Sequence, residues 1–273
     1  MLMSYFPSPL TPGSEQGVTL IELLVAMVIG LVVTGALLLI LEFSLNQETR
    51  ISDKVQADTI GRTAMTKVID KLHSSCTGFG NGGVQVPTGT VSSPLAVTGP
   101  SNLWFITAYG SKTAGAAVIE DATLHDVKWT ATQLSNTGLH LGTLTDYSFA
   151  ATSGNAKEGW QFPATLSVAT ATSSTRLATN VVAPQISEVS TLFQYYKYEA
   201  TGTKKGELTA LASTEFPLTA TTDGEVAKVV VSFTQAPEGG DTRVDRTANV
   251  SDSVLLRFEP TETTSEASNE VCS

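Results

Sequence analysis

The stretch Gly17–Phe43, GVTLIELLVAMVIGLVVTGALLLILEF, decides how the chain begins to fold. From Leu23 to Leu41 it contains nineteen residues without a charge. At a rise of ~1.5 Å per residue, a helix of that length spans about 28 Å, close to the thickness of a bilayer core. The apolar run also exceeds the core of a usual secretory signal peptide. The stretch therefore predicts a retained helix of membrane length.

One carboxylate, Glu22, stands just inside the leading edge of this apolar helix. A charge placed in hydrocarbon costs from roughly 2.5 to more than 10 kcal/mol, so such residues are rare and are usually paired. Two interpretations remain open at this point. Glu22 either has a functional partner, or it lies at the level of the lipid headgroups, where its charge costs little.

The overall composition excludes several classes of protein. The chain has 273 residues, a net charge of -10 and a pI of 4.7, so it lacks the basic patch of a nucleic-acid-binding protein. Its two cysteines, Cys76 and Cys272, and three histidines, His73, His125 and His140, form no short-range metal motif. We find no H-E-x-x-H, G-x-S-x-G or Walker sequence. We therefore expect no enzyme, no cofactor and no metal.

The order G-V-T-L-I-E followed by LLVAMVIG, residues 17–30, resembles the class III signal of type IV pilins and of the pseudopilins of type II secretion. In that family a membrane peptidase cuts after the glycine and methylates the new N-terminus. The resemblance thus implies cleavage after Gly17, N-methylation of Val18, and an assembly role for Glu22 as the fifth residue of the mature chain. It also implies four partners: the prepilin peptidase, other pilin or pseudopilin subunits, the inner-membrane assembly platform, and membrane lipid before assembly.

The spacing of Val18 and Glu22 is compatible with this role. Cleavage before Val18 would create a cationic amine four residues from the acid, and positions i and i+4 share one face of a helix. In a filament, the amine of an incoming subunit can neutralise the acid of its neighbour, and the attraction is much stronger in low dielectric than in water. The spacing alone permits this pairing between subunits, and the family resemblance implies it.

The helix is predicted to continue past the apolar run, over about residues 19–75, which makes it roughly 85 Å long. Asp58 and Arg62 form an i, i+4 pair on its polar side. Apolar residues recur at spacings of three and four on another side, as on one helix face that packs on a soluble domain: Ala64, Met65, Val68, Ile69, Leu72 and Cys76.

Beyond residue 84 the sequence changes to short segments rich in Val, Thr and aromatic residues, which is typical of strands. Six segments are predicted as strands: NLWFITAY (102–109), DVKWTATQL (126–134), ATLSVATA (164–171), STLFQYYKYEA (190–200), EVAKVVVSFTQ (225–235) and DSVLLRFEP (252–260). The predicted fold class is α+β. A long N-terminal helix covers, with its C-terminal half, one face of a mostly antiparallel sheet of six or more strands.

The order from STLFQYYKYEA to EVAKVVVSF is similar to that of the larger minor pilins (PilW-like) and of J-type pseudopilins. We expect five parts: a leader peptide (1–17), a transmembrane or filament-core helix (18–42), the amphipathic half of the same helix (43–76), a β-rich globular head (77–260) and a polar tail (261–273). The resemblance implies a single-pass protein of a bacterial cell membrane, with the head outside the cytoplasm and a later place in a surface filament.

Several side chains of the β-rich region have two interpretations. If the head is exported, Cys76 and Cys272 can form a disulfide, which closes a long loop and is worth about 5 kcal/mol in the chain-entropy model; the alternative is free or differently paired thiols. The segment EGGDTRVD, 238–245, has clustered oxygens that suit calcium but not the spacing of a known loop. The carboxylates Asp121, Asp126, Asp241 and Asp245 are interpreted mostly as solvated surface, and Trp104, Trp129 and Trp160 as core or sheet-face residues.

Three functions remain open. The favoured one is a structural subunit, minor-pilin-like, of a type IV pilus or related filament. The second is a pseudopilin of a type II secretion system, which carries the same motif. The third is a membrane-anchored β-rich binding domain or hydrolase that is not processed, in which Glu22 can be replaced without effect.

Overall fold

The computed structural model describes residues 18–75, 90–91, 99–107, 122–135, 138–155, 159–186, 189–199, 205–212, 215–216, 218 and 226–256. The predictions about Gly17, Cys76, Cys272 and Asp121 lie outside these residues. The chain forms two compact units that divide between Thr49 and Arg50. We call the second, which includes the helix from Arg50 onward, the head unit.

Helix α1 (Leu20–His73) extends over 54 residues and crosses the division between the two units. It confirms the predicted continuous helix to within two residues at each end. No proline interrupts it, and Lys71 and His73 in its last turn suit the negative end of the helix dipole.

The part of α1 before Arg50 is almost entirely exposed, and from Leu23 to Leu41 it is apolar on all sides. In the described part of the chain, α1 is the one helix that is long and apolar enough to cross a membrane, judged by its length and composition. A helix that is hydrophobic all round needs a membrane or a protein core around it.

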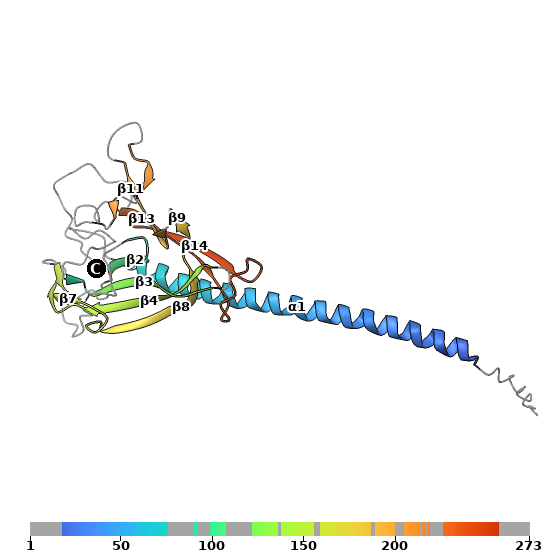
Figure 1. Ribbon diagram of the computed structural model, residues 1–273. Helices are drawn as coiled ribbons and strands as arrows, with labels where there is room; N and C mark the ends of the chain where they lie inside the picture. The colour runs from blue at the N-terminus through green and yellow to red at the C-terminus, as the bar shows by residue number, and fades with distance from the viewer. Residues whose placement is uncertain are drawn as a thin grey trace, which may run out of the picture. The chain divides into compact units, whose positions relative to one another are not determined.

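The head unit is built from short and long strands (Figure 1). Their bounds are β1 (Thr90–Val91), β2 (Asn102–Thr107), β3 (Thr123–Leu134), β4 (His140–Ala150), β5 (Ser153–Asn155), β6 (Gly159–Gln161), β7 (Thr165–Leu166), β8 (Ser173–Val182), β9 (Gln185–Ile186), β10 (Val189–Ser190), β11 (Phe193–Tyr198), β12 (Leu208–Ala210), β13 (Val226–Gln235) and β14 (Ala248–Leu255).

Eight of these strands form one antiparallel sheet in the order β12-β11-β13-β8-β4-β3-β2, with β14 also paired to β13. Strand β13 connects the two parts of the sheet. It pairs with β11 over Val226–Val231 and with β8 only at Thr234 and Gln235, while β14 follows it from Lys228 to Gln235. The predicted sheet of six or more antiparallel strands is confirmed.

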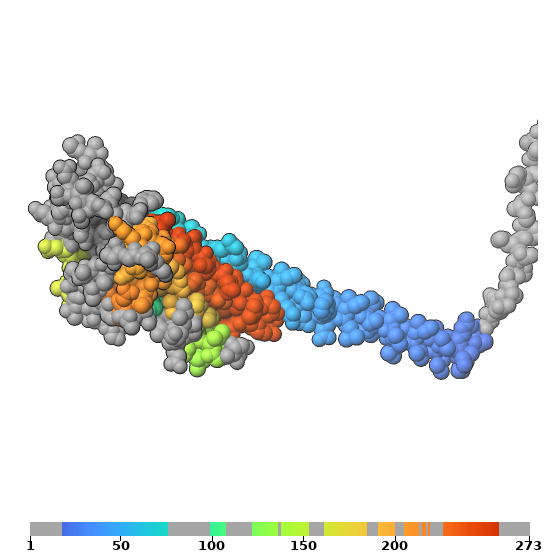
Figure 2. Space-filling view, turned by 90° about the horizontal axis from the view of Figure 1, so that it is seen from above, coloured from blue at the N-terminus to red at the C-terminus, as the bar shows by residue number. Residues whose placement is uncertain are grey.

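The main core lies between α1 and one face of the sheet. Figure 2 shows β13 and β14, in orange and red, lying against the C-terminal half of α1. The helix buries Ala57, Gly61, Ala64, Met65, Val68, Ile69 and Leu72, and five of these are the predicted apolar stripe. The sheet contributes Phe105, Trp129, Phe193 and Phe233 among others. The α+β class, with the helix packed on an antiparallel sheet, is confirmed.

A second core covers the opposite face at the β2–β4 end. Because neighbouring residues of a strand face opposite sides, Leu103 and Phe105 of β2 face the helix, whereas Trp104 and Ile106 belong to the second core. The rings of Trp104 and Phe149 stack there with centroids 5.7 Å apart. Trp104 and Trp129 are buried as expected, and the side chain of Trp160 lies outside the described residues.

One strand prediction was wrong, and two strands were missed. Strands β4 and β8, at the centre of the sheet, were missed, because Thr, Ser, Asp and Arg alternate with their buried residues and dilute the apolar pattern. The segment 164–171 contains only the short β7. Its remainder is a turn held by side-chain hydrogen bonds, in which the Ser167 amide donates to Thr170 Oγ1 at 2.9 Å and Thr170 Oγ1 donates to the Thr165 carbonyl at 3.0 Å.

Candidate assembly site and the base of the head unit

The N-terminal end of α1 is organised by Thr19 and Glu22. The backbone N–H of Glu22 donates to the Thr19 carbonyl at 3.0 Å and to Thr19 Oγ1 at 3.4 Å. Thr19 is therefore the N-cap, and the spacing T-x-x-E is that of a capping box. The carboxylate of Glu22 also lies in the first helical turn, where the helix dipole favours negative charge.

Val18, Leu20 and Glu22 are all exposed at this end, with Val18 70% exposed. The structure thus brings two of the three predicted processing and assembly residues to one accessible helix start.

A comparison with protein families identifies this segment. Residues 13–38 match the model described as the prokaryotic N-terminal methylation motif. The chain carries the methylation motif of prepilins. This motif implies processing by prepilin peptidase and is typical of type IV pilins and pseudopilins, which are structural subunits rather than enzymes. The comparison with curated proteins found no match, and neither did the comparison with solved structures.

A polar cluster joins the C-terminal end of α1 to the sheet. Lys71 of α1 forms an ion pair with Asp146 of β4. His125 Nδ1 of β3 lies 3.0 Å from Asp146 Oδ1, and His125 Nε2 lies 3.2 Å from Thr107 Oγ1 of β2. The imidazole also stacks on Phe105, with centroids 5.2 Å apart. Four side chains, one from each of α1, β4, β3 and β2, therefore connect these elements, with Asp146 and His125 in the middle of the series.

The chain of contacts Thr107–His125–Asp146 has the order of a nucleophile, base and acid. However, all three side chains are buried, and the groove found in the described residues does not reach them. Burial would raise the pKa of Asp146, but hydrogen bonds and charges from His125 and Lys71 lower it below its ordinary value. We interpret the cluster as a device that fixes α1 on the sheet.

Asp126 is a second buried carboxyl. The sequence analysis interpreted it as solvated surface, and the structure corrects this. It lies in β3 on the face away from α1, next to Trp104 in the strand register, and it is fully buried. Burial raises its pKa well above the ordinary value, and the charge of Lys128 and a hydrogen bond from Asn102 only partly oppose this. The cue in the sequence was the aspartate's place within a run of apolar and aromatic residues.

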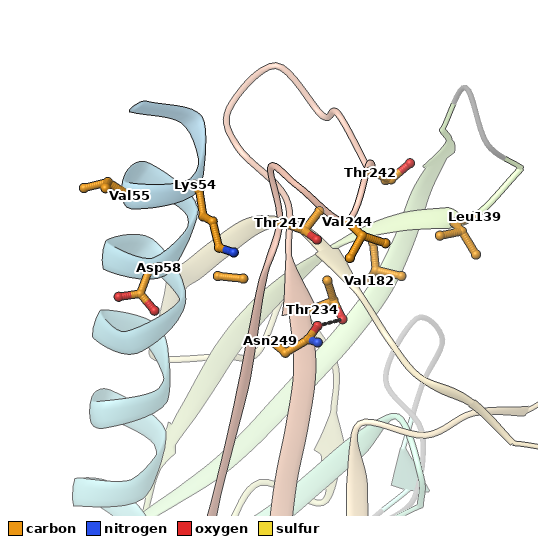
Figure 3. Close-up of a pocket in the computed structure, with 11 residues that line it drawn as sticks. Lys54, Val55, Asp58, Leu139, Val182, Thr234, Thr242, Val244, Thr247 and Asn249 are labelled. Carbon is orange, nitrogen blue, oxygen red and sulfur yellow. Dashed lines mark hydrogen bonds between the residues drawn. The ribbon is translucent and has the colours of Figure 1, made fainter. Parts of the chain in front are cut away.

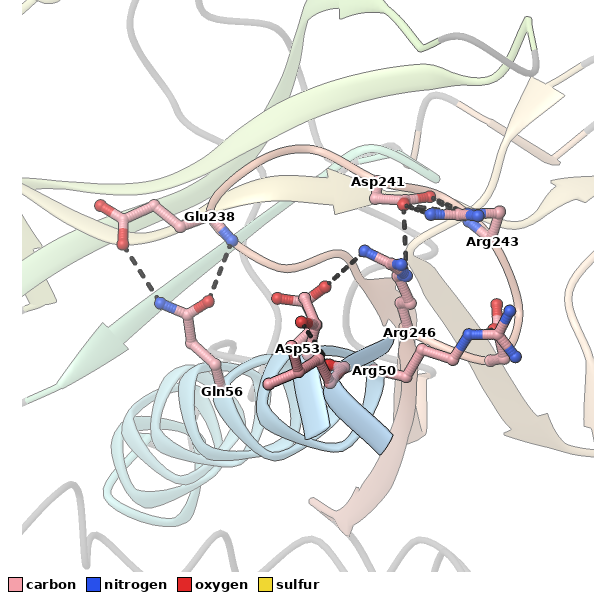
Figure 4. A network of polar contacts seen from close by, with 10 residues as sticks. Arg50, Asp53, Gln56, Glu238, Asp241, Arg243 and Arg246 are labelled. Atoms are coloured by element: carbon pink, nitrogen blue, oxygen red, sulfur yellow. Dashed lines mark hydrogen bonds and ion pairs between the residues drawn. The ribbon is translucent and has the colours of Figure 1, made fainter. Parts of the chain in front are cut away.

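The loop between β13 and β14 forms one side of what we call the base of the head unit, where α1 enters it at Arg50. Arg246 Nη1 of this loop donates to Asp53 Oδ2 of α1 at 2.8 Å, and its Nε lies 3.5 Å from Asp241 Oδ2 (Figure 4). Arg243 Nη2 donates to Asp241 Oδ2 at 2.6 Å. The Arg243 hydrogen bond is the largest cause that lowers the pKa of Asp241.

Two further contacts join this loop to α1. Gln56 Nε2 donates to Glu238 Oε2 at 3.1 Å, and the Glu238 amide donates to Gln56 Oε1 at 3.4 Å. Arg50 Nε lies 3.4 Å from Asp245 Oδ2. The segment 238–245 thus uses its carboxylates for contacts with Arg and Gln. In the described part of the chain, no group of three or more His, Cys, Asp or Glu side chains is arranged to hold a metal ion.

Beside this loop lies a groove of 660 Å³ (Figure 3). Figure 3 shows Lys54 reaching from α1 toward the strand of Thr247. The residues that line the groove include Lys54, Val55, Leu139, Val182, Val244 and Thr247. The walls therefore combine apolar side chains and hydroxyl groups with one cation, Lys54, and one anion, Asp58, whose charge is paired with Arg62. Sequence analysis did not find this groove, because its residues come from four distant segments.

Proposed function

We propose that the chain is a minor-pilin-like structural subunit of a type IV pilus or related filament. Cleavage after Gly17 and methylation of Val18 yield the mature chain, which assembles through its N-terminal helix. The observation that carries this proposal is the methylation motif at residues 13–38, followed by an apolar helix that nothing in the described chain covers. In the filament, the apolar helices of neighbouring subunits cover each other.

Glu22 sets the axial position of one subunit against the next. Its carboxylate is exposed at the helix start, and burial among apolar helices without a partner would be costly. The methylated amine of the neighbouring subunit's first residue is the partner that compensates for this cost. The same geometry also supports a local capping role for Glu22, so the test must separate the two.

The proposed organisation keeps the five parts expected from the sequence. The chain is inserted in a bacterial cell membrane by residues 18–42, with the β-rich part outside the cytoplasm, and then moves into a surface filament. Its partners are prepilin peptidase, other pilin-type subunits and the inner-membrane assembly platform. A disulfide between Cys76 and Cys272 would tie the polar tail to the end of α1.

The experiment compares Glu22→Ala, Glu22→Gln and the control Glu42→Ala in the cell that makes the chain. Glu42 is an exposed acid of the same helix, outside the first turn. We expect all three variants to be cleaved after Gly17. We expect incorporation into sheared filaments to fall at least ~10-fold for both Glu22 variants, equivalent to ~1.4 kcal/mol, and to stay unchanged for Glu42→Ala. Normal incorporation of both Glu22 variants would remove the register role.

A pseudopilin of a type II secretion system is the second candidate, because the same motif serves both assemblies. The readout distinguishes them. A pilus subunit is recovered in sheared surface filaments, whereas a pseudopilin stays with the cell envelope and its deletion stops the secretion of folded proteins.

A further inference from the structure

We propose that the base of the head unit is a docking surface for a different pilin-type subunit. That neighbour inserts an apolar side chain into the groove beside Val244 and places a carboxylate next to Lys54. The inference rests on the proposed function, because it needs a filament in which such a neighbour is held close.

Exposed apolar side chains concentrate at this base. Beyond Leu45, the large apolar residues that the described chain exposes are Ile51, Val55, Leu134, Leu139, Val168, Leu208, Val244 and Leu255. Five of them belong to α1 near Lys54, to the β3–β4 turn or to the β13–β14 loop, and Val55, Leu139 and Val244 line the groove itself. Contiguous apolar exposure of this kind marks interaction sites, whereas single exposed residues do not.

The apolar tip of the loop lies between two residues that form ion pairs. Val244 is 85% exposed, the highest value for a large apolar residue in the described chain. The residues on either side, Arg243 and Asp245, are held by ion pairs with Asp241 and Arg50. A side chain ordered before binding costs less conformational entropy when a partner arrives.

Lys54 indicates the charge of the partner. The other cations of the base, Arg50, Arg243 and Arg246, each form an ion pair with an aspartate. In the described residues Lys54 has no ion pair, whereas the acid that also lines the groove, Asp58, is paired with Arg62. The Lys54 side chain extends from α1 toward the strand of Thr247 (Figure 3). An apolar side chain flanked by a carboxylate therefore fits the groove, and such buried apolar anchors carry most of the energy of an interface.

Charge argues against two other occupants. The base holds as many acids as bases, whereas anionic membranes attract strongly basic segments. From Arg50 onward the chain has 16 Lys and Arg against 22 Asp and Glu, a net charge of -6, so two heads of this chain placed in contact repel each other at low salt. A neighbour of different sequence and lower negative charge is favoured.

The test is site-specific photo-crosslinking with the full-length chain in the cell that makes it. Benzoylphenylalanine replaces Val244, and in two controls it replaces Val168 or Leu208, which are 41% and 37% exposed elsewhere on the head unit. Sheared filaments are irradiated, and the adduct is identified by mass spectrometry. We expect at least ~5-fold more adduct from position 244 than from the controls, with a chain of different sequence that carries its own methylated N-terminus.

Each other outcome overturns the inference. These outcomes are an adduct with a second copy of this chain, an adduct with lipid, or a yield no higher than that of the controls. The same samples test the proposed function separately. If the unsubstituted chain is absent from the sheared filaments, the proposed function fails. If it is present but position 244 gives no specific adduct, only the docking surface fails.

Substitutions that place a negative charge in the groove test the same docking surface. We expect Lys54→Glu and Val244→Glu to reduce incorporation into filaments ~10-fold or more while leaving cleavage before Val18 unchanged, and the matched change Val168→Glu to have no effect. If both base variants enter filaments as well as the control, no neighbour uses the groove.

Discussion

The two halves of α1 differ completely in how they are held. From Leu23 to Leu41, apolar side chains cover every side of the helix and are exposed. After Arg50, one face is buried in the core while the others carry charge, and Gly61 lies so close to the sheet that a Cβ there would be 2.7 Å from Val250 Cγ2. By contrast, a Cβ added at Gly30 or Gly35 would have no atom of another part of the chain within 4 Å.

This difference shows that one regular helix serves two separate structural requirements. The first half exposes an apolar surface, which has to be covered by something outside the chain. A membrane or a filament can cover it. The second half is complete, and its packing, its buried cluster and the loop at the base hold it firmly on the sheet. Perturbations of the two halves should therefore appear in different measurements, assembly for the first and unfolding for the second.

The largest effect should come from breaking the cluster that holds the second half. Asp146→Ala leaves Lys71 and His125 without their shared acid, and removing one partner of a buried ion pair costs about 3–5 kcal/mol. The measurement is denaturant unfolding of the full-length chain in detergent. The matched control, Asp58→Ala, removes only an exposed i, i+4 pair with Arg62 and should cost less than ~1 kcal/mol. Equal effects would mean that the buried cluster does not hold the helix.

The cluster also predicts a dependence on pH. Because the pKa of Asp146 is lowered in the folded state, its contribution is present above the unfolded pKa of ~3.9 and is lost as the pH falls through the folded value. The stability difference between the wild type and Asp146→Asn should therefore narrow as the pH is lowered below ~4. A difference that stays constant down to the acid transition would contradict this assignment.

Replacing one glycine in each half of α1 tests directly whether the two halves are independent. The expected effect on stability is smaller than that of Asp146→Ala. Gly61→Ala forces α1 away from Val250 and Gln235 and should destabilise the head unit by about 1–3 kcal/mol. Gly30→Ala meets no neighbouring atoms and removes a poor helix former, so unfolding of the head unit should not change. Comparable shifts of the unfolding midpoint for the two variants would show that the halves are not separate.

The last prediction concerns Asp126, on the face of the sheet away from the helix, where the effect depends on pH. Its raised pKa means that the folded state keeps a proton that the unfolded chain releases, so stability is lost as the pH rises from ~3.9 through the folded value. Asp126→Asn does not titrate and should gain stability relative to the wild type between pH 4 and pH 8. Unfolding midpoints at several pH values measure this, and a pH-independent difference would show that Asp126 does not titrate in the core.

The sequence predicts the helix and the motif well, because both depend on local patterns. Nineteen uncharged residues, the T-x-x-E start and the stripe from Ala64 to Leu72 each identify a part of α1 without any knowledge of the sheet. The six predicted strand segments indicated the type of sheet for the same reason, although one of them is mostly a turn.

What the sequence could not predict depends on long-range contacts. Strands β4 and β8 are buried by their neighbours rather than by their own composition, so Leu144 and Ala178 do not stand out along the chain. Asp146 and His125 come together only because β3 and β4 pair in one register. The groove at the base similarly requires α1, a turn and a loop to meet, and neither charge nor spacing indicates that.

The measurement that tests the central claim most directly is intact N-terminal mass analysis of the chain from its native membrane or from sheared filaments. The account predicts a chain that begins at Val18 with one added methyl group. A chain that still carries residues 1–17 would contradict it, and a membrane-anchored β-rich domain without processing would then be the better description.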